Sequence, residues 1–239
     1  LFLDECINSI LNQTYKNFKV ILIYDDKDTS ELIKIKKIIK KKNFKFIINK
    51  KNIGPGGSRN KAIELVKTKY IAFLDCDDLW KKNKLEKQLN FMKNNKISFS
   101  HTSYNIINEK NNVIKKMSAK KKTTYNELLK SCDIGLSTVI IEKKILNNFR
   151  FPNLRTKEDY TLWLKIAKSN SKIFGFNLFL SSWRKSNNSI SRNILQKILD
   201  AFRVYYKFER NSFLLSCAFT FRLSLNYLIK HHLEKEIRI

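Results

Sequence analysis

Continuous apolar runs alternate with amphipathic stretches along the first hundred residues. The runs, which are typical of strands covered on both faces, lie at 18–24, 45–49 and 70–74. Apolar residues that recur at helical spacing predict helices at 6–11, 31–41, 62–66 and 85–92. Strands that alternate with helices predict an α/β fold with a mainly parallel central sheet flanked by helices.

The second half of the chain has a different pattern. Antiparallel strands are predicted at 97–107 and 112–117, and a further short strand at 137–143. Thr124 and Glu127 have the spacing of a capping box, so a helix should begin there.

A longer helix is predicted over 154–169, with Asp159, Trp163 and Ile166 on one face. From Ile194 to Ile239 the sequence is helical in character and rich in aromatic and basic residues. No Gly/Ser-rich or Pro-rich linker marks a strong boundary. We therefore expect one domain at 1–193 followed by a helical tail at 194–239.

The net charge of the chain limits the classes of molecule that it is expected to bind. The 239 residues include 48 Lys and Arg against 21 Asp and Glu, which gives a formal net charge of +27. Such an excess suits nucleic acid, an anionic membrane surface or phosphorylated substrates. A general bias towards Lys, Asn and Ile is a competing explanation. The basic residues are spread along the chain and no recognition motif is present, so nucleic acid is not expected as a partner.

The cysteines and the hydropathy of the chain indicate the cellular compartment of the protein. The four cysteines are scattered without zinc-ligand spacing, which favours free thiols in a reducing cytosol. The opening "LFLDECINSI" lacks the basic region of a signal peptide. The longest apolar stretch, 213–229, is interrupted by Arg222 and Asn226. We expect a cytoplasmic protein, either soluble or peripheral at the inner face of the cell membrane.

Acidic residues gather where two predicted strands end. Asp75, Asp77 and Asp78 follow the run at 70–74, and Asp25 and Asp26 follow the run at 18–24. The simple interpretation is a pair of turns, since Asp favours turns and helix caps. The alternative is a divalent-cation site, since carboxylate oxygens bind hard cations such as Mg²⁺. Ligands of parallel sheets bind beyond the carboxyl ends of the strands, where the glycine-rich "NIGPGGSRN" also lies.

These segments together resemble the family 2 glycosyltransferases of the GT-A fold, and more narrowly the bacterial enzymes that build cell-wall, capsular or exopolysaccharide chains. The matching segments, in the family's order, are "ECINSILNQTYKNFKVILIYDD", "NIGPGGSRNKAI", "YIAFLDCDDLW", "KEDYTLWLKI" and "WRKSNNSIS". The resemblance extends from Leu1 to about Asn193.

The resemblance implies transfer of a sugar, with inversion, from a nucleotide diphosphate sugar (UDP in the first instance) to a saccharide or lipid-linked saccharide in surface polysaccharide synthesis. Asp159 would be the general base, with Glu158 beside it as the first alternative. Asp77 would bind Mn²⁺ or Mg²⁺, because the departing diphosphate needs a cation. Asp75 would hold the ribose or share the metal.

Further residues are assigned to the donor by the same resemblance. Asp25 would accept the uracil N–H, and Asp26 would either contact the donor or form a turn. Arg59 would reach the base or the diphosphate, and Gly54 would let the backbone approach closely.

The last assignments each have a structural alternative. Trp163 would wall the acceptor pocket or belong to the core. Arg184, with Ser186 and Ser189, would hold phosphate or close over the donor, or else lie in a solvated loop. The aromatic and basic tail would dock on an anionic membrane or pack on the core.

Two departures from the family pattern bear on activity. The family begins with a strand ending in a P-x-Y-N-like turn, whereas this chain opens at the following helix, and "DDKDTS" replaces the usual D-D-G-S-x-D. We expect the 239-residue chain alone to be destabilised, to bind UDP poorly and to show little transferase activity. An upstream segment that ends in a P-x-Y-N-like turn should restore stability, UDP binding and activity. The alternatives are an inactive sugar-nucleotide-binding remnant, a nucleotidyltransferase or a basic nucleic-acid-binding protein.

Overall fold

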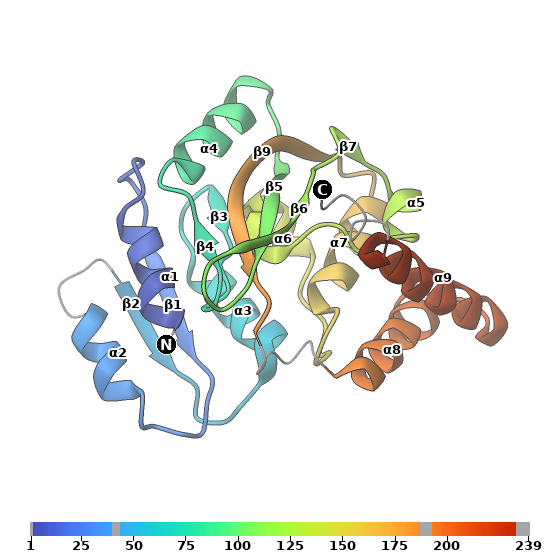
Figure 1. Cartoon of the computed structure of the whole chain (residues 1–239), viewed down its shortest axis with the longest axis horizontal. Coiled ribbons are helices and arrows are strands. Elements are labelled where there is room, and N and C mark those ends of the chain that lie inside the picture. Colours follow the sequence, from blue (N-terminus) through green and yellow to red (C-terminus); the bar gives the residue numbers. More distant parts are fainter. Residues whose placement is uncertain (1, 40–43, 187–192, 233–239) are drawn as a thin grey trace.

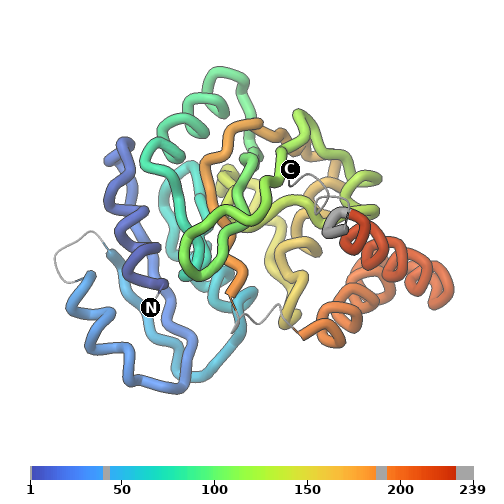
Figure 2. Tube along the Cα trace, viewed as in Figure 1, coloured from blue at the N-terminus to red at the C-terminus, as the bar shows by residue number. Residues whose placement is uncertain are grey.

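The computed structural model describes residues 2–39, 44–186 and 193–232 (Figures 1 and 2). Helices and strands alternate in the first half. In chain order they are α1 (Phe2–Leu11), β1 (Val20–Tyr24), α2 (Leu32–Ile39), β2 (Phe44–Ile48), α3 (Gly54–Leu65), β3 (Tyr70–Ala72), β4 (Leu79–Trp80) and α4 (Lys84–Asn94). The alternation predicted for this half is confirmed, apart from the short β4, which follows β3 directly.

Strands dominate the middle of the chain and helices its end. The elements are β5 (Phe99–Ile107), β6 (Val113–Met117), β7 (Lys122–Thr123), α5 (Tyr125–Leu128), η1 (Leu136–Thr138), β8 (Ile140–Glu142), α6 (Lys143–Asn148), α7 (Glu158–Lys168), β9 (Ile173–Arg184), α8 (Ile194–Arg203), the π-helical turn η3 (Val204–Phe208) and α9 (Phe213–His232). The predicted capping box is present, with Thr124 and Glu127 bonded reciprocally at the start of α5.

The described strands form two sheets, and this corrects the prediction of one mainly parallel sheet. β1 and β2 pair in parallel by themselves. The larger sheet has the order β3-β8-β5-β9-β4, with β6 on β5 and β7 on β9. Within it β5 and β9 are parallel, and the other pairs are antiparallel. An apolar run predicts that a strand is buried but carries no information on its direction, which explains the error.

The largest core cluster lies between the seven-stranded sheet and the helices that follow it. Trp163 and Tyr160 of α7 are fully buried there, with Phe99 of β5 against the Trp163 ring at 5.0 Å between centroids. Burial of aromatic surface of this extent is a main source of folding free energy. This packing holds α7 against the seven-stranded sheet, with the first turn of α7 directed towards the strand ends.

The helical tail packs on the same core. Ala201, Val204, Tyr205 and Leu223 belong to the cluster that contains α7, and the Tyr160 and Tyr205 hydroxyls are 2.9 Å apart. The core-packing alternative for the tail is therefore correct for its inner face. Figure 2 shows α8 and α9 at the opposite end of the long axis from α1 and α2. Among the described residues, no helix is long and apolar enough to cross a membrane.

Candidate active site

The carboxylate of Asp25 is held in one orientation at the end of β1. Its Oδ1 accepts the Asn49 side-chain amide at 2.7 Å and the backbone N–H of Ile53 at 3.0 Å. Lys61 Nζ donates to Asn49 Oδ1 at 2.7 Å, so a second strand end and α3 take part in the same network. Asp26 is exposed, and its Oδ1 accepts the Asp28 N–H at 3.2 Å, which is a turn contact.

The glycine-rich segment opens α3 and places it close to the segment before α7. Gly54 has φ +76°, a conformation that favours glycine. A Cβ on Gly56 would lie 2.7 Å from the carbonyl oxygen of Pro152. Only a residue without a side chain allows this approach, which brings Arg59 on α3 within reach of α7.

Arg59 connects the strand-end aspartates to the catalytic helix predicted from the sequence. Its Nη2 donates to Asp75 Oδ1 at 2.7 Å, and its Nη1 forms a short ion pair with Glu158. Its guanidinium also lies 5.5 Å from the centre of the Phe151 ring. Burial opposes the charge, but the two carboxylates outweigh it and raise the pKa of Arg59. Residues 59, 75 and 158, far apart in sequence, thus form one charged cluster.

Asp78 has a structural role in the turn after β3. It is fully buried, and its carboxylate accepts the Ser137 hydroxyl and, at 2.9 Å, the backbone N–H of Arg184. Asp77, by contrast, is only half-buried. Burial and the charge of Asp75 raise the pKa of Asp77. A cation bound beside Asp75 and Asp77 would relieve this repulsion.

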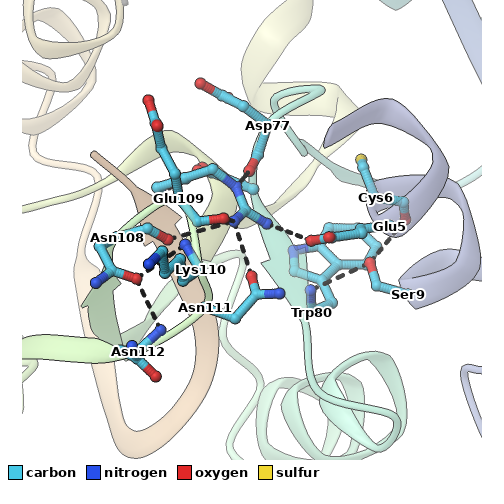
Figure 3. Close-up of polar contacts among 12 residues, drawn as sticks. Glu5, Cys6, Ser9, Asp77, Trp80, Asn108, Glu109, Lys110, Asn111 and Asn112 are labelled. Atoms are coloured by element: carbon cyan, nitrogen blue, oxygen red, sulfur yellow. Dashed lines mark hydrogen bonds and ion pairs between the residues drawn. The ribbon is translucent and has the colours of Figure 1, made fainter. Parts of the chain in front are cut away.

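Arg184 is a buried anchor, which differs from the phosphate contact expected for it. Its side chain is fully buried at the end of β9, and its donors are taken by the carbonyl of Asp77 at 2.8 Å, by Asn111 Oδ1 at 2.7 Å and by Glu5 Oε2 at 2.7 Å. Figure 3 shows Asp77, Glu5 and Asn111 converging from three elements. Arg184 therefore positions the Asp77 turn from within the protein. Of its two expected companions, Ser186 is half-buried just after β9, and Ser189 lies outside the described residues.

The first turn of α7 presents two carboxylates. Asp159 Oδ1 accepts the N–H of Tyr160 at 2.7 Å, which fixes its rotamer. Burial raises the pKa of Asp159, while the nearby Arg59 acts in the opposite direction. Burial and the charge of Asp159 raise the pKa of Glu158 to about 7. The helix N-terminus favours negative charge, so the pair can hold one carboxylate ready to accept a proton.

Trp163 is a core residue, and the expectation that it walls the acceptor pocket is wrong. Its side chain is fully buried against Phe99 and Phe151, at 5.0 and 6.2 Å between ring centroids. The reason is geometric, because one helical turn beyond Asp159 the same face of α7 already points into the core.

The residues present fit a divalent cation bound jointly with a diphosphate. No group of three or more His, Cys, Asp or Glu side chains that could hold a metal exists within the described ranges. Mg²⁺-like ions are commonly bound by one or two carboxylates together with substrate phosphates. Asp75 and Asp77, on one turn, provide such a pair.

Several residues of the site were not anticipated. Asn49 orients Asp25, and Glu5 orients Arg184. Ser137 of η1 bonds to Asp78 and so joins η1 to the turn that carries the aspartates. Asn49 is the last residue of the run at 45–49 and lies at the same sheet edge as Asp25, so its position at a strand end was an available signal. Glu5 and Ser137 carry no comparable signal, because their contacts are long-range.

Arg59 thus joins a carboxylate-rich strand end to the acidic first turn of α7. Residues 1–151 match the model of the family described as glycosyl transferase family 2. The chain belongs to this family and is a glycosyltransferase.

Relatives and solved structures agree with this assignment. Escherichia coli WfgD, a UDP-Glc:alpha-D-GlcNAc-diphosphoundecaprenol beta-1,3-glucosyltransferase, is 38% identical over 210 residues, which cover 87% of this chain and 82% of WfgD. S. aureus TarS in complex with UDP-GlcNAc superposes with a TM-score of 0.71 at 19% identity, over 92% of this chain and 66% of that one. A mannosyltransferase from Pyrobaculum calidifontis, in complex with GDP-Man and Mn²⁺, gives a TM-score of 0.67 at 11% identity, with the same coverage of 92% and 66%. The chain thus spans just under two thirds of these two structures, and the predicted GT-A fold is confirmed.

Proposed function

We propose that the protein transfers a sugar from a UDP-sugar, with inversion, to a saccharide carried on a lipid diphosphate, as a step in surface polysaccharide synthesis. The observation that carries the proposal is the Arg59 bridge between Asp75 and Glu158. It joins the edge expected to hold the donor to the helix expected to hold the base. The similarity to WfgD supports the donor and the acceptor class.

In the proposed reaction the acceptor hydroxyl oxygen forms a bond to the anomeric carbon as the bond from that carbon to the diphosphate oxygen breaks. The hydroxyl proton passes to Asp159, and UDP leaves with the bonding electrons. Asp159 suffices as a base because the proton becomes acidic as the new bond forms. Attack from the face opposite the diphosphate inverts the anomeric centre.

The remaining residues of the site bind and orient the donor. Asp25, held by Asn49, would accept the uracil N–H. Gly54 would let the backbone approach the donor, Asp26 would contribute from the exposed turn beside it, and Arg59 would face the diphosphate charge. A divalent cation on Asp77 and Asp75, when bound, would neutralise charge on the diphosphate.

A transfer assay tests the proposal. UDP-sugars are incubated with a synthetic GlcNAc-diphosphate lipid, with Mn²⁺ or with EDTA, and the product's anomeric configuration is determined by NMR. The expected result is one preferred UDP-sugar, an inverted product and loss of transfer in EDTA. UDP binding without transfer of any sugar would favour the inactive remnant instead. A product that retains the donor configuration would contradict the assigned mechanism.

A further inference from the structure

The helices α8 and α9 expose an unusual amount of apolar surface. Of the eighteen large apolar side chains that are exposed among the described residues, thirteen lie between Ile194 and Ile229. The most exposed of these thirteen are Leu214 at 79%, Leu195 at 74%, and Ile194 and Phe221 at 70% each. Monomeric proteins rarely expose apolar patches of this kind without a binding partner. We call this surface, formed by the exposed residues of 194–229, the tail surface.

The orientation of α8 is the reverse of that in an ordinary surface helix. Such a helix turns its apolar stripe to the core. In α8 the buried positions are Asp200 and Ala201, whereas Ile194, Leu195 and Leu199 are exposed. Asp200 accepts the N–H and hydroxyl of Thr156 at 3.0 and 2.9 Å. These buried bonds fix the rotation of α8 and so keep its apolar face outward.

The same reversal occurs in α9. Its buried residues Ser216, Thr220 and Leu223 lie on one face, and two of the three are hydroxyl residues whose side chains bond to the backbone of the preceding turn. Leu214 and Phe221 lie on the outer side. The rings of Phe202 and Phe213 are 5.5 Å apart, so α8 and α9 form one continuous unit. Figure 1 shows this unit at the edge of the molecule, away from β1 and β2.

The charges on the tail surface have a single sign. The acidic residues within 193–229 are Asp200 and Glu209, and both are buried in ion pairs with Arg203 and Lys168. Exposed bases flank the apolar residues, and they are Arg203, Lys207, Arg210 and Arg222. A second copy of this surface would bring like charges together. Anionic lipid would instead accept both the apolar side chains and the bases.

We propose that the tail surface docks in the interface of an anionic bilayer, with the apolar side chains of α8 and α9 at the boundary between headgroups and acyl chains and the bases on phosphates. This inference goes beyond the transfer reaction and does not depend on it. In this proposal the inner face of the tail packs on the core, and its outer face contacts the membrane.

Vesicle sedimentation tests the proposal on the whole chain. Phosphatidylcholine vesicles with and without phosphatidylglycerol are compared, because the net charge alone could produce some binding. The variant Leu195→Gln/Leu214→Gln/Phe221→Gln removes apolar contact. Its control, Ile33→Gln/Val113→Gln/Leu178→Gln, alters exposed apolar residues elsewhere. Thermal melts verify that each variant is folded.

A second pair of variants tests the charges. Lys207→Gln/Arg222→Gln lies on the tail surface, and Lys36→Gln/Lys37→Gln on α2 produces the same change in net charge. Both tail variants should bind the anionic vesicles at least about tenfold more weakly than the wild type. Both controls should bind as the wild type does. Equal binding by tail and control variants would overturn the proposal, and so would a concentration-dependent dimer that is lost in the apolar tail variant without any vesicle binding.

Discussion

Arg59 connects more parts of the candidate site than any other single residue. The side chain is 17% exposed and holds carboxylates from two elements, with Phe151 against its guanidinium. A buried cation of this kind is stable only with its partners, since an unpaired charge in the interior is costly. In the enzyme with bound donor, the diphosphate would add a further negative partner.

The buried amine of Lys84 lowers the stability of the fold. Its side chain is fully buried at the start of α4, and its Nζ has no hydrogen-bond partner among the described residues and lies 4.0 Å from the centre of the Trp80 ring. Burial lowers the pKa of Lys84 well below its usual value. The unfolded chain therefore binds this proton more tightly than the folded chain does, and this difference favours unfolding more strongly as the pH falls below about 10.

We predict that Lys84→Met increases the free energy of unfolding by about 1–3 kcal/mol at neutral pH. The gain should shrink as the pH rises through about 10.4, because the amine of the unfolded wild type then also loses its proton. Urea melts at several pH values measure this. The exposed Lys87→Met serves as the control and should change stability by less than about 0.5 kcal/mol. A loss of stability in Lys84→Met would show that the amine has an essential contact.

At the scale of elements, the approach of α3 to the segment before α7 determines the geometry of the site. Gly56 touches Pro152 and Phe151, and two bonds between Asn60 and the backbone of Phe151, at 2.9 and 3.0 Å, hold the same contact. Arg59 lies between these two contact residues on α3. Any displacement of α3 would therefore move Arg59 relative to Glu158.

We predict that Gly56→Ala destabilises the protein by about 1–3 kcal/mol, because the added Cβ meets a backbone oxygen that cannot move aside easily. Transfer should decrease even where the variant is fully folded. Gly135→Ala is the matched control, since its Cβ would meet atoms at an ordinary 3.7 Å. Melting curves and transfer rates of both variants provide the comparison. Equal behaviour of the two variants would refute the role given to the α3 contact.

At the scale of the whole molecule, the site depends on the tail. Asp200 of α8 bonds to Thr156, two residues before Glu158, while Val204, Tyr205 and Leu223 fill the core beside α7. The predicted division of the chain at Asn193 therefore separates two parts that differ in the character of their sequence. In the structure these two parts share one core.

We predict that a chain ending at Asn193 loses its cooperative thermal transition. Removal of the tail exposes Tyr160 and leaves buried polar groups such as the Thr156 N–H without partners. Losses of this kind add up to a large part of a typical stability of about 5–15 kcal/mol. Differential scanning calorimetry of the shortened and full chains measures it. A cooperative transition at the wild-type temperature in the shortened chain would contradict the shared core.

The sequence predicted which residues of the site lie at strand ends and at the start of α3 better than it predicted their exact roles. Asp25, Asp75 and Arg59 were predictable because strand ends and a glycine-rich helix start are local patterns. The burial of Trp163 and Arg184 depends on packing between distant segments, which periodicity does not contain. No strand was predicted over 173–184, where Gly175 interrupts the apolar pattern. In the structure that glycine lets the carbonyl of Lys120 approach β9 closely.

The central claim, that α7 supplies the catalytic base of a transferase, is tested most directly by Asp159→Asn. Transfer from the preferred UDP-sugar and the affinity for UDP with Mn²⁺ are measured in the same preparation. The control is Asp4→Asn, which alters a half-exposed aspartate on α1. We predict that Asp159→Asn lowers the transfer rate by about 10²-fold or more with unchanged UDP affinity, since the amide cannot accept the proton. Turnover near the wild-type rate in Asp159→Asn would contradict the account and direct attention to Glu158.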